Sequence, residues 1–373
     1  MQRLARGMRR IGVDVDLVVM HGKAAASQPP LDPETRIVDL QSPRLWSCLP
    51  ALVKYIRRER PAAIIAAAWL GNGLAGLAKR LSGRPIPVIL TEHALLLFRF
   101  AEEGAVRHKV LKALLTRGYR AADAFVAVSH GVADELRKLP FVAPSRIHVI
   151  YNPVWSPELV SRSQQPAEHP WLSDGSTIPV LISAGRLDRL KGFDTLLRAL
   201  VQVRQKRDAR LIILGEGEER TALESLVSKL DLEDCVDMPG FVANPERFMS
   251  RAAVFVLSSR TEALPTVLIE SLACGTPIVS TDCRTGPREI LEESKYGTLV
   301  PVDDAGALAA AILEKLTDPG DRNALRSRAK DFSEEAAARQ YLELIDRIYT
   351  ESRYQCVVRD PLPPQPPVHV GNG

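Results

Sequence analysis

Cysteine is scarce and dispersed in this sequence. The 373 residues contain five cysteines and no Cys-x-x-Cys pair. An odd, scattered set argues against a disulfide framework or a zinc site, and it is typical of a reducing compartment. We therefore expect a cytoplasmic protein.

Long apolar runs are missing as well. No stretch approaches the roughly 20 apolar residues that a membrane-spanning helix needs. The first 20 residues are basic, but their apolar run comes late and no small-residue cleavage site follows it. These residues therefore make a poor signal peptide.

Charge is unevenly distributed along the chain, although the net charge is only +4. Residues 1–160 carry 23 Lys and Arg against 13 Asp and Glu, whereas the remainder carries 26 against 32. A basic half suggests contact with an anionic partner, and ordinary solvated charge explains it equally well. Within it, residues 98–120 mix basic and apolar side chains. That composition suits an interfacial helix on anionic lipid, with a solvated basic helix face as the commoner alternative.

Short apolar segments alternate with helical patterns along the whole chain, whose length fits two α/β domains. This alternation predicts parallel sheets that helices cover on both faces, and therefore an α/β protein. The expected strands are 13–20, 62–69, 87–93, 124–129 and 147–152, followed by 179–185, 209–215, 253–259, 276–281 and 297–302.

A Pro- and Ser-rich stretch at 153–178 interrupts this alternation and is interpreted as an interdomain linker. It separates an N-terminal domain, 1–152, from a second domain, 179–335. We expect a helix at 336–353 to pack back toward the first domain, and the Pro/Gly-rich tail 354–373 to be disordered. Two doubly wound domains would then face each other across a cleft and bind ligands at the carboxyl ends of their strands.

The segment GRLDRLKG (185–192) places two cations between a strand and a helix. Arg186 offers a planar, bidentate fork for phosphate, and Lys191 a mobile point charge. The following helix N-terminus presents free N–H groups to an anion. A diphosphate site is one interpretation, and a solvated loop is the alternative.

The segment TEALPTVLIE (261–270) carries two glutamates eight residues apart. Glu262 lies in a loop, where a carboxylate can orient sugar hydroxyls or stabilise an oxocarbenium-like transition state. Glu270 lies inside the next helix and can accept hydrogen bonds from ribose hydroxyls. Pro265 sits where the first helical turn would begin. Two surface glutamates at a helix start are the simpler alternative.

Further polar and glycine positions follow expected strands. His93 ends a strand and can bind a sugar hydroxyl, although a structural histidine is as good an interpretation. Gly215 and Gly217 occupy a strand-to-helix turn, and Phe241 and Val242 occupy another. Either turn can flank a nucleobase, but each signal is weak by itself.

Taken together, these segments resemble glycosyltransferase family 4, a family of retaining enzymes with the GT-B fold. The resemblance covers roughly residues 1–350. Although each motif is weak, their common order and spacing are specific. The motifs are GRLDRLKG (185–192), LGEG (214–217), GFVANP (240–245), TEALPTVLIE (261–270) and GTPIVSTDCRTGPREIL (275–291).

The resemblance implies a role for each of these positions. Glu262 and His93 would face the transferred sugar as the catalytic pair. The donor diphosphate would be bound by Arg186 and Lys191 and by the backbone of Leu264, Pro265 and Thr266. The ribose and base would be bound by Glu270, Gly215, Gly217, Phe241 and Val242.

The implied reaction is transfer of a hexose or N-acetylhexosamine from a UDP- or GDP-sugar to a hydroxyl acceptor, with retention. The acceptor would be a glycan or a lipid-linked glycan of polysaccharide or lipopolysaccharide synthesis. No metal or other cofactor is expected, in agreement with the lack of an Asp-x-Asp motif at a strand end. We expect a cytoplasmic enzyme with peripheral contact to anionic membrane, and no nucleic-acid partner.

The sequence departs from the family pattern at its start. Family members usually open with a strand and a Gly-rich loop, whereas residues 2–11 here already read as a helix. We therefore expect a gap or exposed edge in the first sheet, an incomplete acceptor site and low stability. The main alternative is a catalytically inactive remnant that binds nucleotide or a partner. The arrangement around Glu262 and Glu270 disfavours another GT-B enzyme, such as a sugar-nucleotide 2-epimerase or a phosphorylase.

Overall fold

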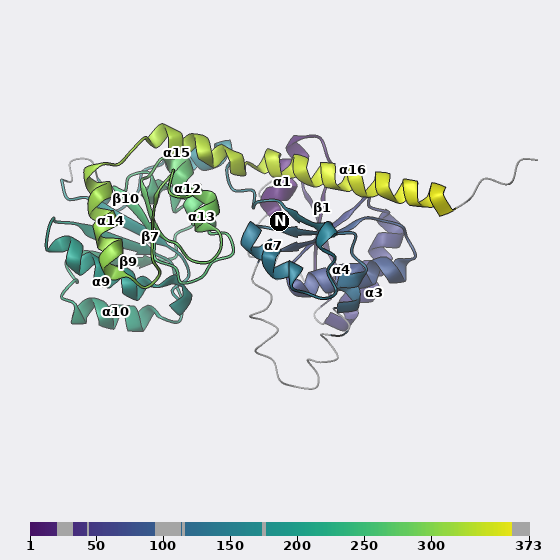
Figure 1. Cartoon of the computed structure of the whole chain (residues 1–373), viewed down its shortest axis with the longest axis horizontal. Helices are drawn as coiled ribbons and strands as arrows, with labels where there is room; N and C mark the ends of the chain where they lie inside the picture. Colours follow the sequence, from purple (N-terminus) through teal and green to yellow (C-terminus); the bar gives the residue numbers. More distant parts are fainter. Residues whose placement is uncertain (21–32, 43–44, 94–112, 114–115, 174–176, 360–373) are drawn as a thin grey trace, which may run out of the picture.

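The protein has two α/β halves that lie side by side (Figure 1). The structure is a computed structural model, and it describes all residues except 21–32, 43–44, 94–112, 114–115, 174–176 and 360–373. Each half contains parallel strands and packed helices, as the alternating sequence pattern predicts. Among the described residues, no helix is both long enough and apolar enough to cross a bilayer.

The second half is built on one six-stranded parallel sheet, in the order β12-β11-β10-β7-β8-β9. The chain starts in the middle, moves to one edge, and returns to β10 beside β7. This is the doubly wound order, and its reversal falls between β7 and β10. The strands are β7 (Val180–Ala184), β8 (Arg210–Leu214), β9 (Val236–Gly240), β10 (Val254–Leu257), β11 (Ile278–Thr281) and β12 (Thr298–Val300).

Helices cover both faces of this sheet, so its inner strands are buried throughout. Their continuous apolar sequences follow from that double cover. Local signals fix the helix ends. Gly192 precedes α9 and Gly275 follows α12, both with left-handed backbone, and Asp304 caps α14. The helices are α9 (Phe193–Arg204), α10 (Arg220–Lys229), α11 (Glu246–Met249), α12 (Thr266–Cys274), α13 (Pro287–Ile290), α14 (Ala305–Thr317) and α15 (Arg322–Ala329).

The strands of the first half form two parallel sheets rather than one. β1 (Asp16–Val19) pairs with β2 (Arg36–Asp39). A four-stranded sheet follows in chain order, made of β3 (Ile64–Ala67), β4 (Val88–Glu92), β5 (Ala124–Ala127) and β6 (Ile147–Val149). β4 and β5 are fully buried, whereas β1 and β3 are half-buried. Within the described chain, β1 and β3 each pair on one side only.

The longest helix, α16, leaves the second half and runs along the first (Figure 1). It packs against α1 in a cluster that includes Leu4, Met8, Ala338 and Tyr341. The approach is close, because a Cβ on Gly7 would lie 2.3 Å from the carbonyl oxygen of Glu334. The helices around the first half are α1 (Gln2–Arg10), α3 (Leu45–Glu59), α4 (Trp69–Ser82), α7 (His130–Arg137) and α16 (Glu334–Arg359), whereas α8 (Pro157–Ser163) packs against α11 and α12 of the second half.

Several expectations from the sequence differ from these elements. Strands β2 and β9 were not expected. The stretch 153–178, interpreted as a linker, contains α8, which Ser156 caps by accepting from the backbone of Leu159. Helix α16 continues to Arg359, beyond the expected end at 353. The expected tail beyond that point, and most of the basic stretch 98–120, lie outside the described residues.

Candidate active site

The site begins where the sheet of the second half reverses direction. The loop after β7 and the loop after β10 leave neighbouring strands at their carboxyl ends, which is where doubly wound sheets bind ligands. The ammonium group of Lys191, in the first loop, lies 2.6 Å from Oε1 of Glu262 in the second. Ser259 donates a hydrogen bond of 2.7 Å to the same oxygen. The structure therefore brings together Lys191, predicted to bind the diphosphate, and Glu262, the predicted catalytic carboxylate.

Glycines allow these loops to approach backbone to backbone. Gly192 has a φ of +61°, and a Cβ there would lie 2.2 Å from the carbonyl oxygen of Ser258. A Cβ on Gly215 would lie 1.9 Å from the carbonyl oxygen of Gly185. Gly217 is equally close to the loop after β7, with its Cβ position 2.2 Å from the Leu187 oxygen. Both glycines of the LGEG turn therefore lie directly against residues 185–192, the predicted diphosphate-binding loop, which is called the phosphate loop below.

Arg186 lies on the phosphate loop but does not contact Glu262 in the described chain. Its side chain is 74% exposed and donates from Nε to Asp188 at 2.7 Å. Asp188 also accepts a hydrogen bond from the backbone of Leu190. The aspartate therefore orders both the loop backbone and the guanidinium of Arg186. Arg186 is thus positioned on the solvent side of the loop, where an entering anion would meet it first.

The amino end of α12 forms the next wall of the site. Leu264 and Pro265 are buried, Pro265 is the N-cap, and Thr266 is the first helical residue. Gly286 packs against this turn, with its Cβ position 2.5 Å from Cδ of Pro265. The free N–H groups of the first turn are suited to an anion.

A cavity of about 270 Å³ lies between the two halves. It brings together His93, from the end of β4, and Thr266, from the start of α12. Two of the predicted site residues from different halves therefore share one cavity. The complete lining is Met1, Arg3, Leu4, His93, Ile150, Tyr151, Asn152, Pro153, Thr266 and Tyr341.

His93 keeps an exposed surface at the edge of this cavity and is held in its neutral form. Partial loss of hydration lowers the pKa of His93 to about 4, and the positive charge of the nearby α-amino group acts in the same direction. A hydrogen bond with Asn152 acts in the opposite direction. A neutral imidazole can both donate and accept a hydrogen bond, so His93 is suited to binding a hydroxyl near pH 7.

Glu270 lies on α12, one turn beyond Thr266, and is buried. Its Oε1 accepts a hydrogen bond of 3.0 Å from Nη2 of Arg3, which belongs to α1 in the first half. Burial raises the pKa of Glu270, and Arg3 lowers it. Glu270, which is predicted to bind the ribose, therefore has the Arg3 guanidinium as its partner.

The two residues predicted near the base differ in exposure. Phe241 is 78% exposed, whereas Val242 packs against the apolar core. Their loop adjoins the LGEG turn, because Gly215 donates a backbone hydrogen bond of 2.9 Å to Gly240. The ring of Phe241 is therefore available at the surface beside this turn.

Three residues of this site were missed by sequence reasoning. Ser259 precedes Glu262 by three residues, and its proximity in sequence was the available signal. Asn152 follows the predicted strand that ends beside His93. Arg3 had no signal beyond its charge, since its contact with Glu270 joins opposite ends of the chain.

Two family models match this chain. "Glycosyl transferases group 1" matches residues 168–332, and "Glycosyltransferase Family 4" matches residues 1–154. The two matches adjoin and together cover most of both halves.

Curated relatives match parts of the chain. A Campylobacter jejuni N-acetylgalactosamine-N,N'-diacetylbacillosaminyl-diphospho-undecaprenol 4-alpha-N-acetylgalactosaminyltransferase is 33% identical over 59% of this chain and 58% of its own length. The Rhizobium meliloti lipopolysaccharide core biosynthesis glycosyltransferase LpsE is 32% identical over 61% of this chain and 65% of its own length. The chain thus spans somewhat over half the length of these relatives.

Solved structures match over nearly the whole chain. Sucrose-phosphate synthase from Thermosynechococcus elongatus superposes with a TM-score of 0.71 at 25% identity, covering 94% of this chain and 92% of that chain. The Anabaena protein Alr3699/HepE, solved in complex with UDP-glucose, has a TM-score of 0.72 at 18% identity, covering 93% and 94%. The second similarity supports the GT-B fold alone.

Proposed function

The chain belongs to glycosyltransferase family 4, and from that premise we propose that it transfers a hexose or N-acetylhexosamine from a UDP- or GDP-sugar to a hydroxyl acceptor. The acceptor is a glycan or lipid-linked glycan of polysaccharide or lipopolysaccharide synthesis. The family match supports the reaction type. The names of the relatives support this class of acceptor.

In this proposal, the donor diphosphate lies between the phosphate loop and the amino end of α12. Lys191 and Arg186 neutralise its charge, and the backbone N–H groups of Leu264 and Thr266, on either side of Pro265, donate to its oxygens. The bond between C1 of the sugar and the diphosphate breaks, so negative charge grows on the leaving group. Fixed positive groups therefore stabilise the transition state, which carries this extra charge, more strongly than the ground state. This difference lowers the barrier.

The transferred sugar occupies the space between Glu262 and His93. Glu262, in the second half, accepts hydrogen bonds from sugar hydroxyls. Neutral His93, in the first half, binds another hydroxyl of the same sugar. The acceptor oxygen forms its bond to C1 on the face that the diphosphate leaves, and its proton passes to the departing phosphate oxygen. Retention follows from this geometry. The ribose hydroxyls bind Glu270, with the base beside Gly215, Gly217, Phe241 and Val242.

The observation that carries this proposal is the Lys191–Glu262 contact at the reversal point of the sheet, at 2.6 Å. It joins a phosphate-binding cation to a carboxylate at the place where the fold binds ligands. The test is calorimetric titration with UDP, GDP and ADP of the wild type and Glu270→Ala. We expect one nucleotide to bind, and the substitution to weaken it at least tenfold, on the order of a lost charged hydrogen bond.

Glu314→Ala is a matched control, since Glu314 is an exposed glutamate on a helix of the same half. It should leave nucleotide affinity unchanged. Failure of the folded wild type to bind any nucleotide would refute the donor site. Binding without sugar transfer to any acceptor would favour a nucleotide-binding protein instead.

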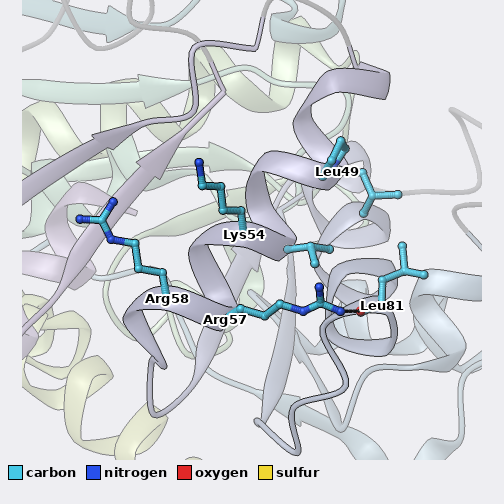
Figure 2. Close-up of a pocket in the computed structure, with 7 residues that line it drawn as sticks. Leu49, Lys54, Arg57, Arg58 and Leu81 are labelled. Carbon is cyan, nitrogen blue, oxygen red and sulfur yellow. Dashed lines mark hydrogen bonds between the residues drawn. The ribbon is translucent and has the colours of Figure 1, made fainter.

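We also propose that the first half contacts an anionic membrane surface, where a lipid-linked acceptor would be found. A groove between α3 and the end of α4 has an apolar floor and a basic rim (Figure 2). Lys54 and Arg58 are exposed, and Leu81 is 54% exposed. Arg57 donates to the carbonyl oxygen of Leu81 at 2.8 Å, so it ties the two helices together. Each basic residue near an anionic bilayer contributes about 1 kcal/mol.

Sedimentation with phosphatidylserine-containing and neutral vesicles tests this contact. We expect binding only to the anionic vesicles, and loss of that binding in Lys54→Glu/Arg58→Glu. The control Lys206→Glu/Lys229→Glu makes the same charge change at exposed sites of the second half. Equal sedimentation with both vesicle types, or equal loss in both variants, would contradict the assignment.

A further inference from the structure

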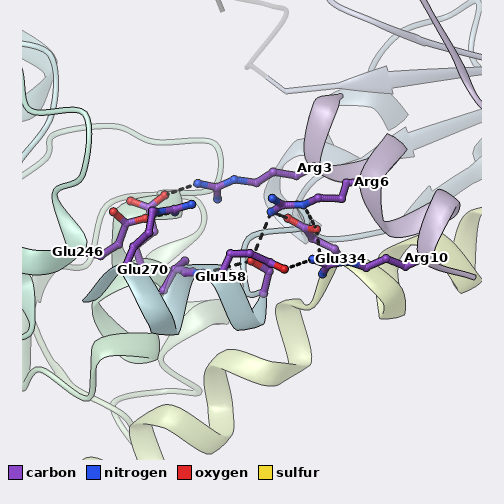
Figure 3. Close-up of polar contacts among 10 residues, drawn as sticks. Arg3, Arg6, Arg10, Glu158, Glu246, Glu270 and Glu334 are labelled. Carbon is purple, nitrogen blue, oxygen red and sulfur yellow. Dashed lines mark hydrogen bonds and ion pairs between the residues drawn. The ribbon is translucent and has the colours of Figure 1, made fainter. Parts of the chain in front are cut away.

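One face of α1 carries three arginines that pair with carboxylates of three other helices (Figure 3). Arg3, Arg6 and Arg10 follow one another at intervals of three and four, which places them on one side of a helix. Arg3 pairs with Glu270 of α12, Arg6 with Glu334 of α16, and Arg10 with Glu158 of α8. Each arginine therefore meets a carboxylate from a different element.

The position of α1 is fixed independently of Arg3. Arg6 donates twice to Glu334, from Nε at 2.8 Å and from Nη2 at 2.5 Å. Glu334 is buried, and Gly7 allows α1 to approach its backbone closely. A bidentate pair at a close approach sets both the register and the rotation of the helix. Arg3 is thereby held toward Glu270 by contacts that do not involve the candidate site.

Glu270 lies in a group of buried charges. Glu246 of α11 is also buried, Arg162 of α8 lies 2.5 Å from its Oε1, and its Oε2 accepts no hydrogen bond in the described residues. Glu270 has Arg3 on Oε1, and only Arg3 donates to this carboxylate within the described chain. Two buried carboxylates in one region cannot both stay ionised without nearby cations.

We propose that Arg3 is a positioning residue that keeps Glu270 ionised, so that Glu270 accepts hydrogen bonds from the ribose hydroxyls of the donor. This inference rests on the proposed nucleotide-sugar function. An ionised carboxylate accepts through both oxygens, whereas a protonated one must use one oxygen as a donor. A ribose diol offers two O–H donors, and an ionised carboxylate accepts from both through stronger, charge-assisted hydrogen bonds.

Opposing influences act on the carboxyl group of Glu270. Burial is the largest and leaves the pKa of Glu270 raised overall; Glu246 raises it further, while Arg3 and Arg162 lower it. Among the other packed elements, Arg326 of α15 donates to the backbone of Cys274 at the far end of α12. Glu289 of α13 is engaged by backbone N–H groups at the start of α7. Arg3 is thus the cation that directly contacts Glu270.

The arrangement makes ribose recognition depend on both halves. Because Arg3 belongs to α1, its pair with Glu270 forms only when the first half lies against the second. A donor that needs the charged form would favour that closed arrangement by its differential affinity.

The test compares Arg3→Met with wild type by calorimetry, from pH 5.5 to 8. The probes are UDP and 2′,3′-dideoxy-UDP, with GDP and its dideoxy analogue in parallel. We expect wild-type affinity for the ribonucleotide to fall less at low pH than that of the variant. In Arg3→Met it should fall by up to tenfold per pH unit below the raised pKa of Glu270. The dideoxy analogue should bind both proteins equally, and Arg3→Lys should restore most of the affinity.

Arg10→Met is the matched control, since it removes the same charge from the same helix without contact to Glu270. It should leave the pH profile unchanged. Equal or tighter ribonucleotide binding by Arg3→Met at every pH would overturn the inference, and so would an equal loss on the dideoxy analogue. An unchanged affinity in Glu270→Ala would overturn the proposed donor site itself, a result that the Arg3 variants alone cannot produce.

Discussion

Replacing Gly192 by alanine should destabilise the second half and open the phosphate loop. Two features of Gly192 each contribute. Its φ of +61° is left-handed, which costs an alanine about 1–2 kcal/mol. The new Cβ would also lie 2.2 Å from the carbonyl oxygen of Ser258, and relieving such an overlap costs about 1–3 kcal/mol. The expected loss in the free energy of unfolding is therefore about 2–5 kcal/mol, the sum of the two costs.

Two other glycines of the same half separate these features. Gly320 has a φ of +68° with nothing within 4 Å of its Cβ position, so Gly320→Ala tests the backbone cost alone. Gly217 lies outside the left-handed region, but its Cβ position is 2.2 Å from the Leu187 oxygen, so Gly217→Ala tests the overlap alone. We expect losses of about 1–2 and about 1–3 kcal/mol.

The assay is urea denaturation followed by far-ultraviolet circular dichroism, with midpoint and slope compared among the three variants. Nucleotide titration of the folded variants is the second readout. Gly192→Ala should weaken binding more than Gly320→Ala, because it moves Lys191 away from Glu262. If Gly192→Ala were no less stable than Gly320→Ala and bound nucleotide as well as wild type, the close approach of the two loops would have no importance for the site.

Two predictions concern turnover. Lys191→Ala should lower kcat by about a hundredfold, since it removes a fixed cation from the leaving group. Arg186→Ala should lower kcat by about tenfold, because Arg186 is exposed to solvent. Turnover within threefold of wild type in both variants would refute the role of this pair. Because the pKa of His93 is lowered to about 4, the neutral ring that binds sugar persists on the acidic side, and kcat/KM should show no His93 titration between pH 5 and 8. An acid limb near pH 6.5 that disappears in His93→Gln would contradict that environment.

The second half was largely predictable from its sequence because its signals are local. A strand, a glycine-containing loop and a helix follow one another along the single segment 179–207, and the structure reproduces that order as β7 and α9. Strands β2 and β9 were missed because they are partly exposed edge strands, and β9 contains Pro239, which a sheet tolerates at an edge or a bulge.

Helix α8 was missed although the sequence carried its start signal. Ser156 followed by Pro157 is a capping residue followed by a proline at the first helical position. The high proline content of 153–178 concealed it. Contacts between distant segments were beyond prediction for a different reason. Nothing in the separate motifs indicates that Lys191 pairs with Glu262, or that Arg3 reaches Glu270, because only the folded topology brings them together.

The two glutamates of the TEALPTVLIE segment share one electrostatic arrangement. Glu262 and Glu270 are each 10% exposed, and each contacts one cation, Lys191 or Arg3, that is itself largely buried. Such pairs contribute little net stability, since desolvation offsets most of their attraction. If the role of these pairs were purely structural, apolar side chains would stabilise the fold equally well. The two pairs, which flank the amino end of α12, are therefore better explained by ligand binding: the cations favour the charged carboxylates, and the carboxylates can accept hydrogen bonds from hydroxyl groups. The Lys191 pair lies within the second half, whereas the Arg3 pair joins both halves, so only the second depends on closure of the cleft.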